Sequence, residues 1–383
     1  MASSRLVVDL DAISANYRAL DSMSAAHTHT AATVKANGYG LGTLGVSLAC
    51  YAGGCRTFCV ARLEEALDLR AQFNRCDITD TQIILFEGVT HSDASVYTHN
   101  RLTAVVNQLS ELELIQSWGD KAPPFLVHVD TAMSRLGFPA NEAEHILPAL
   151  STIDNYLGVM SHLACADMPD NPINARQLEQ FRAITTQISD DQKIFSLANS
   201  GGIFLGAEYH FNLTRPGIAL SGTAIDDRQL GAEMLTPACR WVTDILQIRT
   251  IQAGESVGYG ADFTAEKQMH IATLGVGYAD GYPRQLSAPN DHRPRIEIAG
   301  VMCPLIGRIS MDTLVADISA IPVSQHAELT TATLVGAHYS ISDMAGDCNT
   351  IGYEILTTLG ARTYRQYNST DTVLMDRLKK GEC

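Results

Sequence analysis

Eight short apolar runs, separated by amphipathic segments, restrict the fold of this chain more than any other feature. The runs cover residues 33–36, 58–61, 83–87, 103–107, 125–131, 156–163, 194–200 and 213–220. The segments between them, such as RLEEALDLRAQF and NARQLEQFRAITTQI, carry apolar residues at intervals of three and four, as one face of a helix does. Alternating strands and helices predict a parallel sheet, and eight strands predict a closed (β/α)8 barrel. LDAISANYRALDSM predicts a helix before the first strand, with Asp11 capping its first turn.

The pattern changes after about residue 235, where strand-like runs and glycine turns replace the helices until TIGYEILTTLG. The change predicts two domains of an α/β chain. We expect a TIM-like barrel over residues 1–235 and a mainly β domain over residues 236–383, which the first few residues of the chain could join. A chain of 383 residues is long enough for two such cores.

Charge and cysteine content narrow the classes of partner. The net charge of -15 would repel nucleic acid and anionic membrane surfaces, so an acidic ligand needs local positive charge. No export signal or membrane-length apolar run is present, and we expect a cytoplasmic protein. The nine cysteines include no C-x-x-C pair and predict buried thiols, and the two histidines of AHTHTAA lack further ligands at zinc-site spacing, so no metal site is predicted.

Polar residues stand where the predicted strands end, at the edge where barrels of this kind hold their active sites. They are Lys35, His162, Asn199, Ser200 and Arg215. A lysine in an apolar strand is costly to bury unless it is paired or chemically used, and covalent attachment of a carbonyl cofactor is one such use. A salt-bridged or snorkelling lysine is the common alternative.

Two glycine-containing segments follow the seventh strand and overlap the eighth. ANSGG and RPGIALSG offer small residues and backbone N–H groups where barrels commonly bind phosphate, although glycines alone would equally suit tight turns.

Longer motifs add a resemblance to a known family. VKANGYG, VDTAMSRLGF, SHLACAD, ANS, RPGIALSG, VGYGADF, VGYADGYPR, GRISMDT and GYEI occur in this order along nearly the whole chain. In sequence and order they resemble the motifs of the alanine racemase family, fold type III enzymes that use pyridoxal 5'-phosphate (PLP).

The resemblance implies roles for individual residues. Lys35 would carry PLP covalently and Tyr259 would be the second catalytic base. The implied cofactor contacts are Tyr39, His162, Asn199, Ser200, Arg215, Gly217, Ile218 and Tyr353. The substrate carboxylate would meet Arg135 and the backbone amide of Met311. Asp167, Tyr278, Arg284, Arg308 and Asp312 match positions of the entryway and the substrate loop.

Racemisation requires removal of the α-proton from one face and its return on the other, so two opposed bases are needed. The resemblance implies that Lys35 serves the D-enantiomer and Tyr259, from the second subunit of a homodimer, serves the L-enantiomer. A phenol is a poor base at neutral pH unless cations favour its phenolate, and we expect His162 and Arg215 to provide that charge. Arg215 would face the pyridine nitrogen and, because a guanidinium keeps its proton, leave the ring unprotonated.

Four positions depart from the common pattern. Gly38 and Leu41 replace an alanine and a histidine in the lysine motif, and Ser196 replaces a histidine. His128 stands where many relatives have a carbamylated lysine that orients the active-site arginine. Because histidine cannot supply that negative charge, we expect an anion, chloride in the first instance, near Arg135.

The resemblance implies an isomerase, alanine racemase (EC 5.1.1.1), that supplies D-alanine for cell-wall peptidoglycan. Tyr353 favours alanine over serine, because a smaller polar residue there would open the pocket. A serine or broader-specificity racemase remains the nearest alternative. A noncatalytic PLP-binding barrel would lack residues 236–383, and a decarboxylase would need other motifs in place of VGYG and SMDT.

Overall fold

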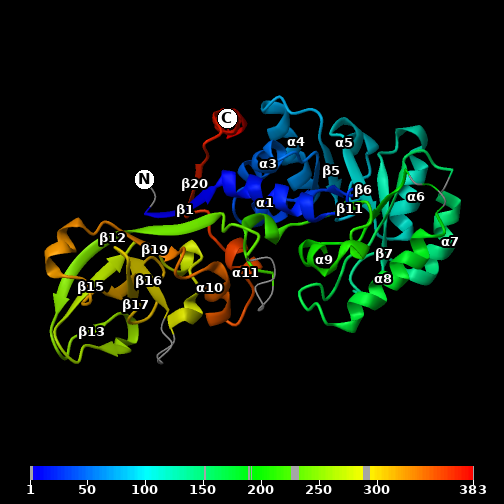
Figure 1. Cartoon of the computed structure of the whole chain (residues 1–383). Coiled ribbons are helices and arrows are strands. Elements are labelled where there is room, and N and C mark those ends of the chain that lie inside the picture. The colour runs from blue at the N-terminus through cyan, green and yellow to red at the C-terminus, as the bar shows by residue number, and fades with distance from the viewer. Residues whose placement is uncertain are drawn as a thin grey trace. The chain divides into compact units, whose positions relative to one another are not determined.

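The structure, a computed structural model, describes residues 3–150, 152–188, 190, 192–225, 233–287 and 294–382. Its internal contacts divide the chain into two compact units (Figure 1). The barrel unit comprises Leu10–Pro237 and Ser369–Cys383, and the β unit comprises Met1–Asp9 and Ala238–Asn368. The units change near residue 237, close to the expected boundary at 235, but the last segment of the chain groups with the barrel unit.

Seven parallel strands form the sheet of the barrel unit, in the order β10-β9-β7-β6-β5-β4-β3. Their bounds are β3 (Ala32–Thr33), β4 (Thr57–Val60), β5 (Gln82–Leu85), β6 (Leu102–Val106), β7 (Phe125–Asp130), β9 (Tyr156–Met160) and β10 (Ile194–Ser196), with β8 (Phe138–Pro139) beside β7. An eighth position is filled by β11 (Leu213–Thr214), which pairs with β2 (His29–Thr30).

Backbone hydrogen bonds at this eighth position join the two edges of the sheet. The amide of Arg215 donates to the carbonyl of Ala198 over 2.9 Å, and the amide of Thr33 donates to the carbonyl of Pro216 over 2.8 Å. The barrel expected from the eight apolar runs is therefore confirmed.

Helices flank the strands of the barrel unit (Figure 1). They are α1 (Leu10–Met23), α3 (Thr43–Ala52), α4 (Leu63–Arg75), α5 (Ala94–His99), α6 (Leu109–Ser117), α7 (Ala140–Leu150), α8 (Pro172–Thr185), α9 (Ser200–Leu205) and α12 (Thr372–Glu382). The helix expected before the first strand has the predicted bounds. The prediction that Asp11 caps its first turn was wrong. Its carboxylate accepts the amide and the hydroxyl of Thr370, both over 2.7 Å, because it lies inside the first turn rather than before it.

The barrel interior is a packed layer rather than a channel. The layer is made of buried side chains contributed from different strand positions around the barrel. They are Ala31, Cys59, Ile84, Val105, Leu126, Met160 and Leu213. This floor closes the barrel below the carboxyl ends of the strands, where ligand sites of such barrels lie.

The β unit is built on a sheet of order β17-β16-β19-β12-β1-β20, and β15 joins β12 to β18. The strands are β1 (Ser4–Asp9), β12 (Cys239–Ile251), β15 (Met269–Leu274), β16 (Arg295–Ile298), β17 (Val301–Pro304), β18 (Leu314–Asp317), β19 (Thr331–Val335) and β20 (Tyr364–Asn368). Two short helices follow β19, α10 (Ile341–Asp347) and α11 (Gly352–Thr357). The first strand of the chain thus pairs with β12 and β20 of this unit.

The cysteines lie as expected. Of the eight in the described ranges, all are free thiols, six are buried and two are half-buried, while Cys383 lies outside those ranges. Among the described helices, none combines the length and the apolar character needed to cross a bilayer.

Candidate active site

A cavity of about 500 Å³ opens at the carboxyl ends of the barrel strands. Its lining consists of Lys35, Ala61, Arg62, Phe86, Glu87, Val105, His128, Arg135, Leu136, Met160 and His162. Lys35, Arg62 and Arg135 give the cavity the local positive charge that an anionic ligand needs in a chain of net charge -15. The structure therefore brings Lys35, Arg135 and His162 together, as the sequence predicted.

Lys35 lies just beyond β3, the strand that was expected to end with it, and not within that strand. Strand β3 ends at Thr33, and Lys35 begins a turn, α2 (Lys35–Tyr39), whose backbone is left-handed from Ala36 onward. Burial is the main cause that lowers the pKa of the Lys35 amine, and the nearby Arg135 guanidinium lowers it further. Both effects favour the neutral amine that covalent chemistry requires.

Arg215 is fully enclosed and bonds only to neutral oxygens. Its guanidinium donates to the hydroxyl of Ser196 and, over 2.6 Å, to the carbonyl of Ser161. Burial lowers the pKa of Arg215 to about 10, so the group stays charged at neutral pH. Ser196, which replaces the common histidine, thus still contacts the arginine, and no carboxylate pairs with Arg215 in the part of the chain that the structure describes.

His162 does not carry the expected positive charge. Burial first, and then the neighbouring Arg215, lower the pKa of the His162 imidazole well below its ordinary value, so the ring is neutral at pH 7. Its Nε2 accepts a long hydrogen bond of 3.4 Å from the Asn199 amide. The expectation that His162 carries positive charge in the site was therefore wrong. The cations that act on Lys35 are Arg135 and Arg215.

The predicted phosphate residues gather on one side of the barrel. The hydroxyl of Ser200, at the start of α9, accepts the amides of Gly217 over 2.9 Å and Ala219 over 3.3 Å. A Cβ on Gly217 would lie 2.2 Å from the hydroxyl oxygen of Tyr39, so only glycine lets that hydroxyl approach the backbone. Ile218 follows within this turn and is buried.

Two residues that the sequence analysis did not select contribute to this site. Asn107 directly follows β6 and bonds to His128 over 2.8 Å, and Glu65 accepts the amide of Ala36 beside Lys35 over 2.6 Å. Asn107 could have been found as a polar residue after a strand. Glu65 could have been found as the acidic third residue of α4, where a capping box places it.

The other predicted residues lie in the β unit, where three loops meet. Tyr259 begins a short turn and is 73 % exposed. Arg308 forms an ion pair with Asp262 of that turn. A Cβ on Gly277 would lie 2.3 Å from the carbonyl oxygen of Met311, so the loops at 277 and 311 touch through their backbones.

The entryway residues fall into smaller groups. Tyr278 and Arg284 line a cavity of about 230 Å³ with α11, the helix that carries Tyr353. Asp312 pairs with Arg362 over 2.8 Å. Asp167 is an exposed residue of the barrel unit.

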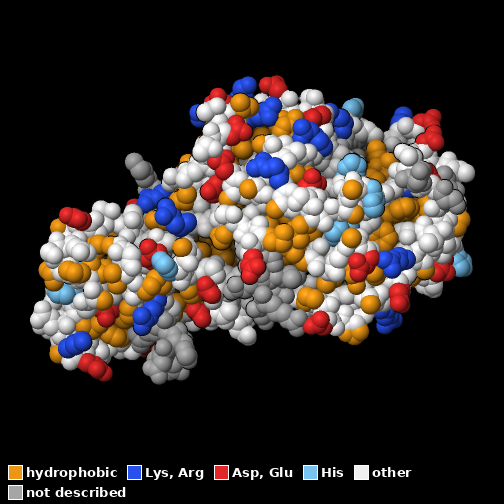
Figure 2. All heavy atoms as spheres, viewed as in Figure 1, with side chains coloured by type: hydrophobic (Ala, Val, Ile, Leu, Met, Phe, Trp, Pro, Cys, Tyr) orange, Lys and Arg blue, Asp and Glu red, His pale blue; other side chains and the backbone are white. Residues whose placement is uncertain are grey.

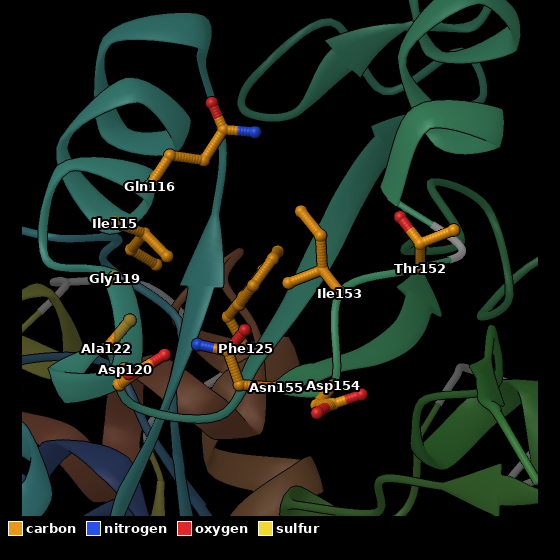
Figure 3. A pocket seen from close by; sticks show the side chains of 10 residues that line it. All are labelled: Ile115, Gln116, Gly119, Asp120, Ala122, Phe125, Thr152, Ile153, Asp154 and Asn155. Carbon is orange, nitrogen blue, oxygen red and sulfur yellow. The ribbon is translucent and has the colours of Figure 1, made fainter.

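A second cavity of about 470 Å³ lies at the opposite, amino ends of the strands, between α6, β7 and the turn before β9 (Figure 3). It is as large as the first, but its charged lining residues are Asp120 and Asp154. Carboxylates would repel a phosphate or a substrate carboxylate. On the face shown in Figure 2, Lys and Arg side chains are mixed with Asp and Glu side chains. Chemistry rather than size therefore selects the cavity around Lys35.

Comparison with known proteins agrees with this geometry. Residues 8–224 match the family described as "Alanine racemase, N-terminal domain", and residues 238–367 match "Alanine racemase, C-terminal domain". An alanine racemase of Cereibacter sphaeroides is 40% identical over 371 residues, covering 96% of this chain and 99% of that protein. A protein named "Alanine racemase, catabolic" from Agrobacterium fabrum is 40% identical over 374 residues, covering 96% and 92%.

Solved structures show the same similarity. The alanine racemase of Bartonella henselae, solved with covalently bound pyridoxal phosphate, has a TM-score of 0.83 and 34% identity and covers 96% of this chain and 100% of its own. The biosynthetic alanine racemase of Pseudomonas aeruginosa has a TM-score of 0.86 and 33% identity with the same coverage. Both domain models match in order over most of the chain, relatives 40% identical match over nearly its whole length, and the chain therefore belongs to the alanine racemase family.

Proposed function

We propose that this chain interconverts L- and D-alanine with pyridoxal phosphate held on Lys35. The observation that carries the assignment is the cavity in which the Lys35 amine, with its lowered pKa, faces the cation Arg135. Family membership supplies the reaction, and the cavity supplies a nucleophilic amine beside positive charge.

The residues present fit the cofactor. The hydroxyls of Tyr39 and Ser200 lie beside the backbone of residues 217–219, and the amides of Gly217 and Ala219 donate to the Ser200 hydroxyl there. Hydroxyls and backbone amides are the donors that phosphate groups take in barrels. We therefore assign Tyr39, Ser200, Asn199, Gly217 and Ile218 to the phosphate side.

When bound, pyridoxal phosphate supplies an electron-withdrawing ring joined to the substrate amino group, which makes the α-proton easier to remove. Lys35 holds the cofactor and accepts or returns the proton on one face, a role that burial favours because it lowers the pKa of the amine. Arg215 is held by Ser161 and Ser196 and keeps its own proton, so it orients the ring without acting as an acid. Arg135 and the amide of Met311 bind the substrate carboxylate.

Tyr259 serves the other face of the substrate in this proposal. Its side chain is 73 % exposed on a single chain. A base that removes a proton from the α-carbon needs a site from which water is excluded. A second copy of the chain would complete the site, and we therefore propose a homodimer in which each active site combines Lys35 of one subunit with Tyr259 of the other.

Alanine is the proposed substrate, and Tyr353 is the residue proposed to keep the pocket small. A serine racemase is the second candidate, because the two substrates differ by one hydroxyl. A coupled assay of the purified protein with L-alanine and L-serine separates the two. We further propose that the product serves peptidoglycan synthesis, which rescue of a D-alanine-requiring strain would test; location in the cytoplasm stays a prediction.

The decisive test of the site is Lys35→Ala, because covalent attachment and one base disappear together. We expect loss of the visible absorbance of the lysine-bound cofactor and a fall in racemisation of at least about 10³-fold. Lys121→Ala, at an exposed lysine outside the cavity, is the matched control. Racemisation and a normal absorbance spectrum in Lys35→Ala would refute the assignment.

A further inference from the structure

The backbone that carries Lys35 is strained. Ala36, Asn37, Gly38 and Tyr39 have φ angles of 52°, 55°, 60° and 53°, all in the left-handed region. For residues other than glycine and asparagine this conformation costs about 1 to 2 kcal/mol each, so Ala36 and Tyr39 are unfavourable. Such a run persists only when the surroundings hold it in place.

Most of the bonds that hold this turn come from its own backbone. The amide of Gly38 donates to the carbonyl of Val34 and that of Gly40 to the carbonyl of Ala36, both over 2.9 Å. The first amide of the left-handed run, that of Ala36, bonds instead to a side chain from another element. It donates to Oε1 of Glu65 in α4 over 2.6 Å.

Glu65 connects two segments through its two oxygens. While Oε1 holds Ala36, Oε2 accepts the amides of Ala61 over 2.9 Å and Arg62 over 3.1 Å, in the loop between β4 and α4. The bond from Arg62 is the one that the third residue of a helix makes back to the residue before the helix in a capping box, although Arg62 itself has no acceptor to return it. The Oε1 bond is not part of the cap, because it joins α4 to the turn that follows Lys35.

The same carboxylate acts on the lysine through space. Arg135 and Arg215 lower the pKa of the Lys35 amine, whereas Glu65 raises it and Cys59 raises it to a smaller extent. Removing the charge of Glu65 would therefore leave the amine among cations with less compensation.

We propose that Glu65 is a positioning residue for the racemisation: by holding the amide of Ala36, it sets the direction in which Lys35 enters the cavity and the place of Tyr39 at the far end of the turn. The link to Tyr39 follows from the close approach of its hydroxyl to Gly217. The inference rests on the proposed function of Lys35, but the hold on Ala36 can be measured without any reaction.

The test compares Glu65→Gln with Glu64→Gln in the PLP-bound enzyme. Glu64 is the matched control, because it is also acidic in the first turn of α4 but is exposed. A glutamine offers one acceptor oxygen where Glu65 offers two, so either Ala36 or the cap loses its partner. Hydrogen exchange of the residue 35–40 segment should accelerate about tenfold in Glu65→Gln and stay unchanged in Glu64→Gln.

Activity is the second measurement. A displaced lysine should lower kcat roughly 10- to 100-fold with a change in KM for alanine of less than about threefold, because binding groups elsewhere are intact. The limb of the pH profile that reports Lys35 should move to lower pH, since the amine loses a stabilising anion. Glu65→Asp keeps the charge but shortens the reach, so it should restore the pH limb while exchange at Ala36 stays fast.

Each outcome decides the proposal. Unchanged exchange in both Glu65→Gln and Glu65→Asp would show that Glu65 only caps α4, and faster exchange with a normal kcat would show that the hold does not position Lys35. Either result overturns the inference. If Glu65→Gln does not fold, the exchange and kcat of Glu65→Asp decide in the same way. Failure of the proposed function would appear separately, as activity in Lys35→Ala.

Discussion

The proton on His128 can be placed from its neighbours. The Nδ2 amide of Asn107 donates to the carbonyl of Phe86 over 3.1 Å, so the Asn107 oxygen must face the Nδ1 of His128, 2.8 Å away. That nitrogen therefore carries the hydrogen. Burial first, and then Arg215, lower the pKa of the imidazole to about 4, which leaves Nε2 as a bare acceptor. His128 is thus a neutral group in the cavity that it shares with the cation Arg135.

The lowered pKa of His128 predicts acid sensitivity. Above the ordinary value of 6.5 the ring is neutral in both the folded and the unfolded chain; as the pH falls from 6.5 toward 4, only the unfolded chain gains the proton, so the fold loses stability. Between pH 7.5 and 5 this effect costs about 2 kcal/mol. His128→Gln should remove it.

Urea unfolding of wild type and His128→Gln at both pH values measures the difference. The comparison with the variant is needed because His162 has a lowered pKa as well and destabilises the fold in the same direction. An identical pH dependence in the two proteins would contradict the assignment.

Arg135 is an exposed cation for which the described part of the chain offers no carboxylate within ion-pair distance. With a neutral His128 nearby, we expect an anion such as chloride beside it. Crystals grown with bromide should show anomalous density next to Arg135, and replacing halide with a larger anion at constant ionic strength should lower activity. A carboxylate bound directly to Arg135 in those crystals would exclude the anion.

Tyr259→Phe removes only the phenol oxygen of the second proposed base. We expect normal cofactor absorbance, loss of racemisation by about 10²- to 10⁴-fold, and survival of α-proton exchange from D-alanine, which Lys35 serves. Tyr364→Phe, at another exposed tyrosine of the β unit, is the control. Equal loss of exchange from both enantiomers would argue against this division between the bases.

At the scale of elements, the sequence predicted the strands well and the turns poorly. Each of the eight apolar runs begins within one residue of a barrel strand, because alternation of buried strands and amphipathic helices is a strong signal, but the last two runs extend four and six residues beyond β10 and β11. The left-handed turn after Lys35 could not be foreseen, since Ala36 and Tyr39 disfavour this conformation and Glu65 holds the turn from another element. Likewise, the neutral state of His162 depends on burial that no local pattern reports.

Gly158 tests how closely the barrel strands pack. Its φ is 140°, and a Cβ there would lie 2.1 Å from the carbonyl oxygen of Ile194 on β10. Because the obstacle is backbone, Gly158→Ala should push β9 from β10 and lower the free energy of unfolding by about 3 kcal/mol or more.

Gly54→Ala is the matched control for this change. Gly54 also has a positive φ, 113°, but nothing lies within 4 Å of the added carbon, so only backbone strain of about 1 kcal/mol is expected. Urea unfolding compares the two, and equal losses would show that strain rather than the contact with β10 dominates.

At the scale of the whole molecule, the chain passes between its two units three times, after Asp9, Pro237 and Asn368. The sequence predicted the second passage, because the pattern of elements changes there. It missed the third, since a short helix after β20 carries no sign of the unit to which it belongs. The second subunit, likewise, rests on the exposed Tyr259 and on family resemblance.

Mixed dimers test that second subunit. When Lys35→Ala and Tyr259→Phe chains are co-expressed, half of the dimers should be mixed, and each mixed dimer has one site with both native bases, so about a quarter of wild-type activity should return. Each variant alone should remain inactive. No recovery in dimers shown to be mixed would place Lys35 and Tyr259 of one site in the same chain.

The return of the last helix to the barrel affects how the protein is made. Gly381 of α12 packs so closely on the barrel that a Cβ there would lie 2.7 Å from Leu44 and 2.8 Å from Cys76, and Arg75 donates to its carbonyl over 2.8 Å. About 300 residues are translated between Cys76 and this contact, which at typical rates of synthesis takes roughly 15 to 60 s. During that time the surface of α3 and α4 that α12 covers stays exposed on the nascent barrel, where chaperones can bind it.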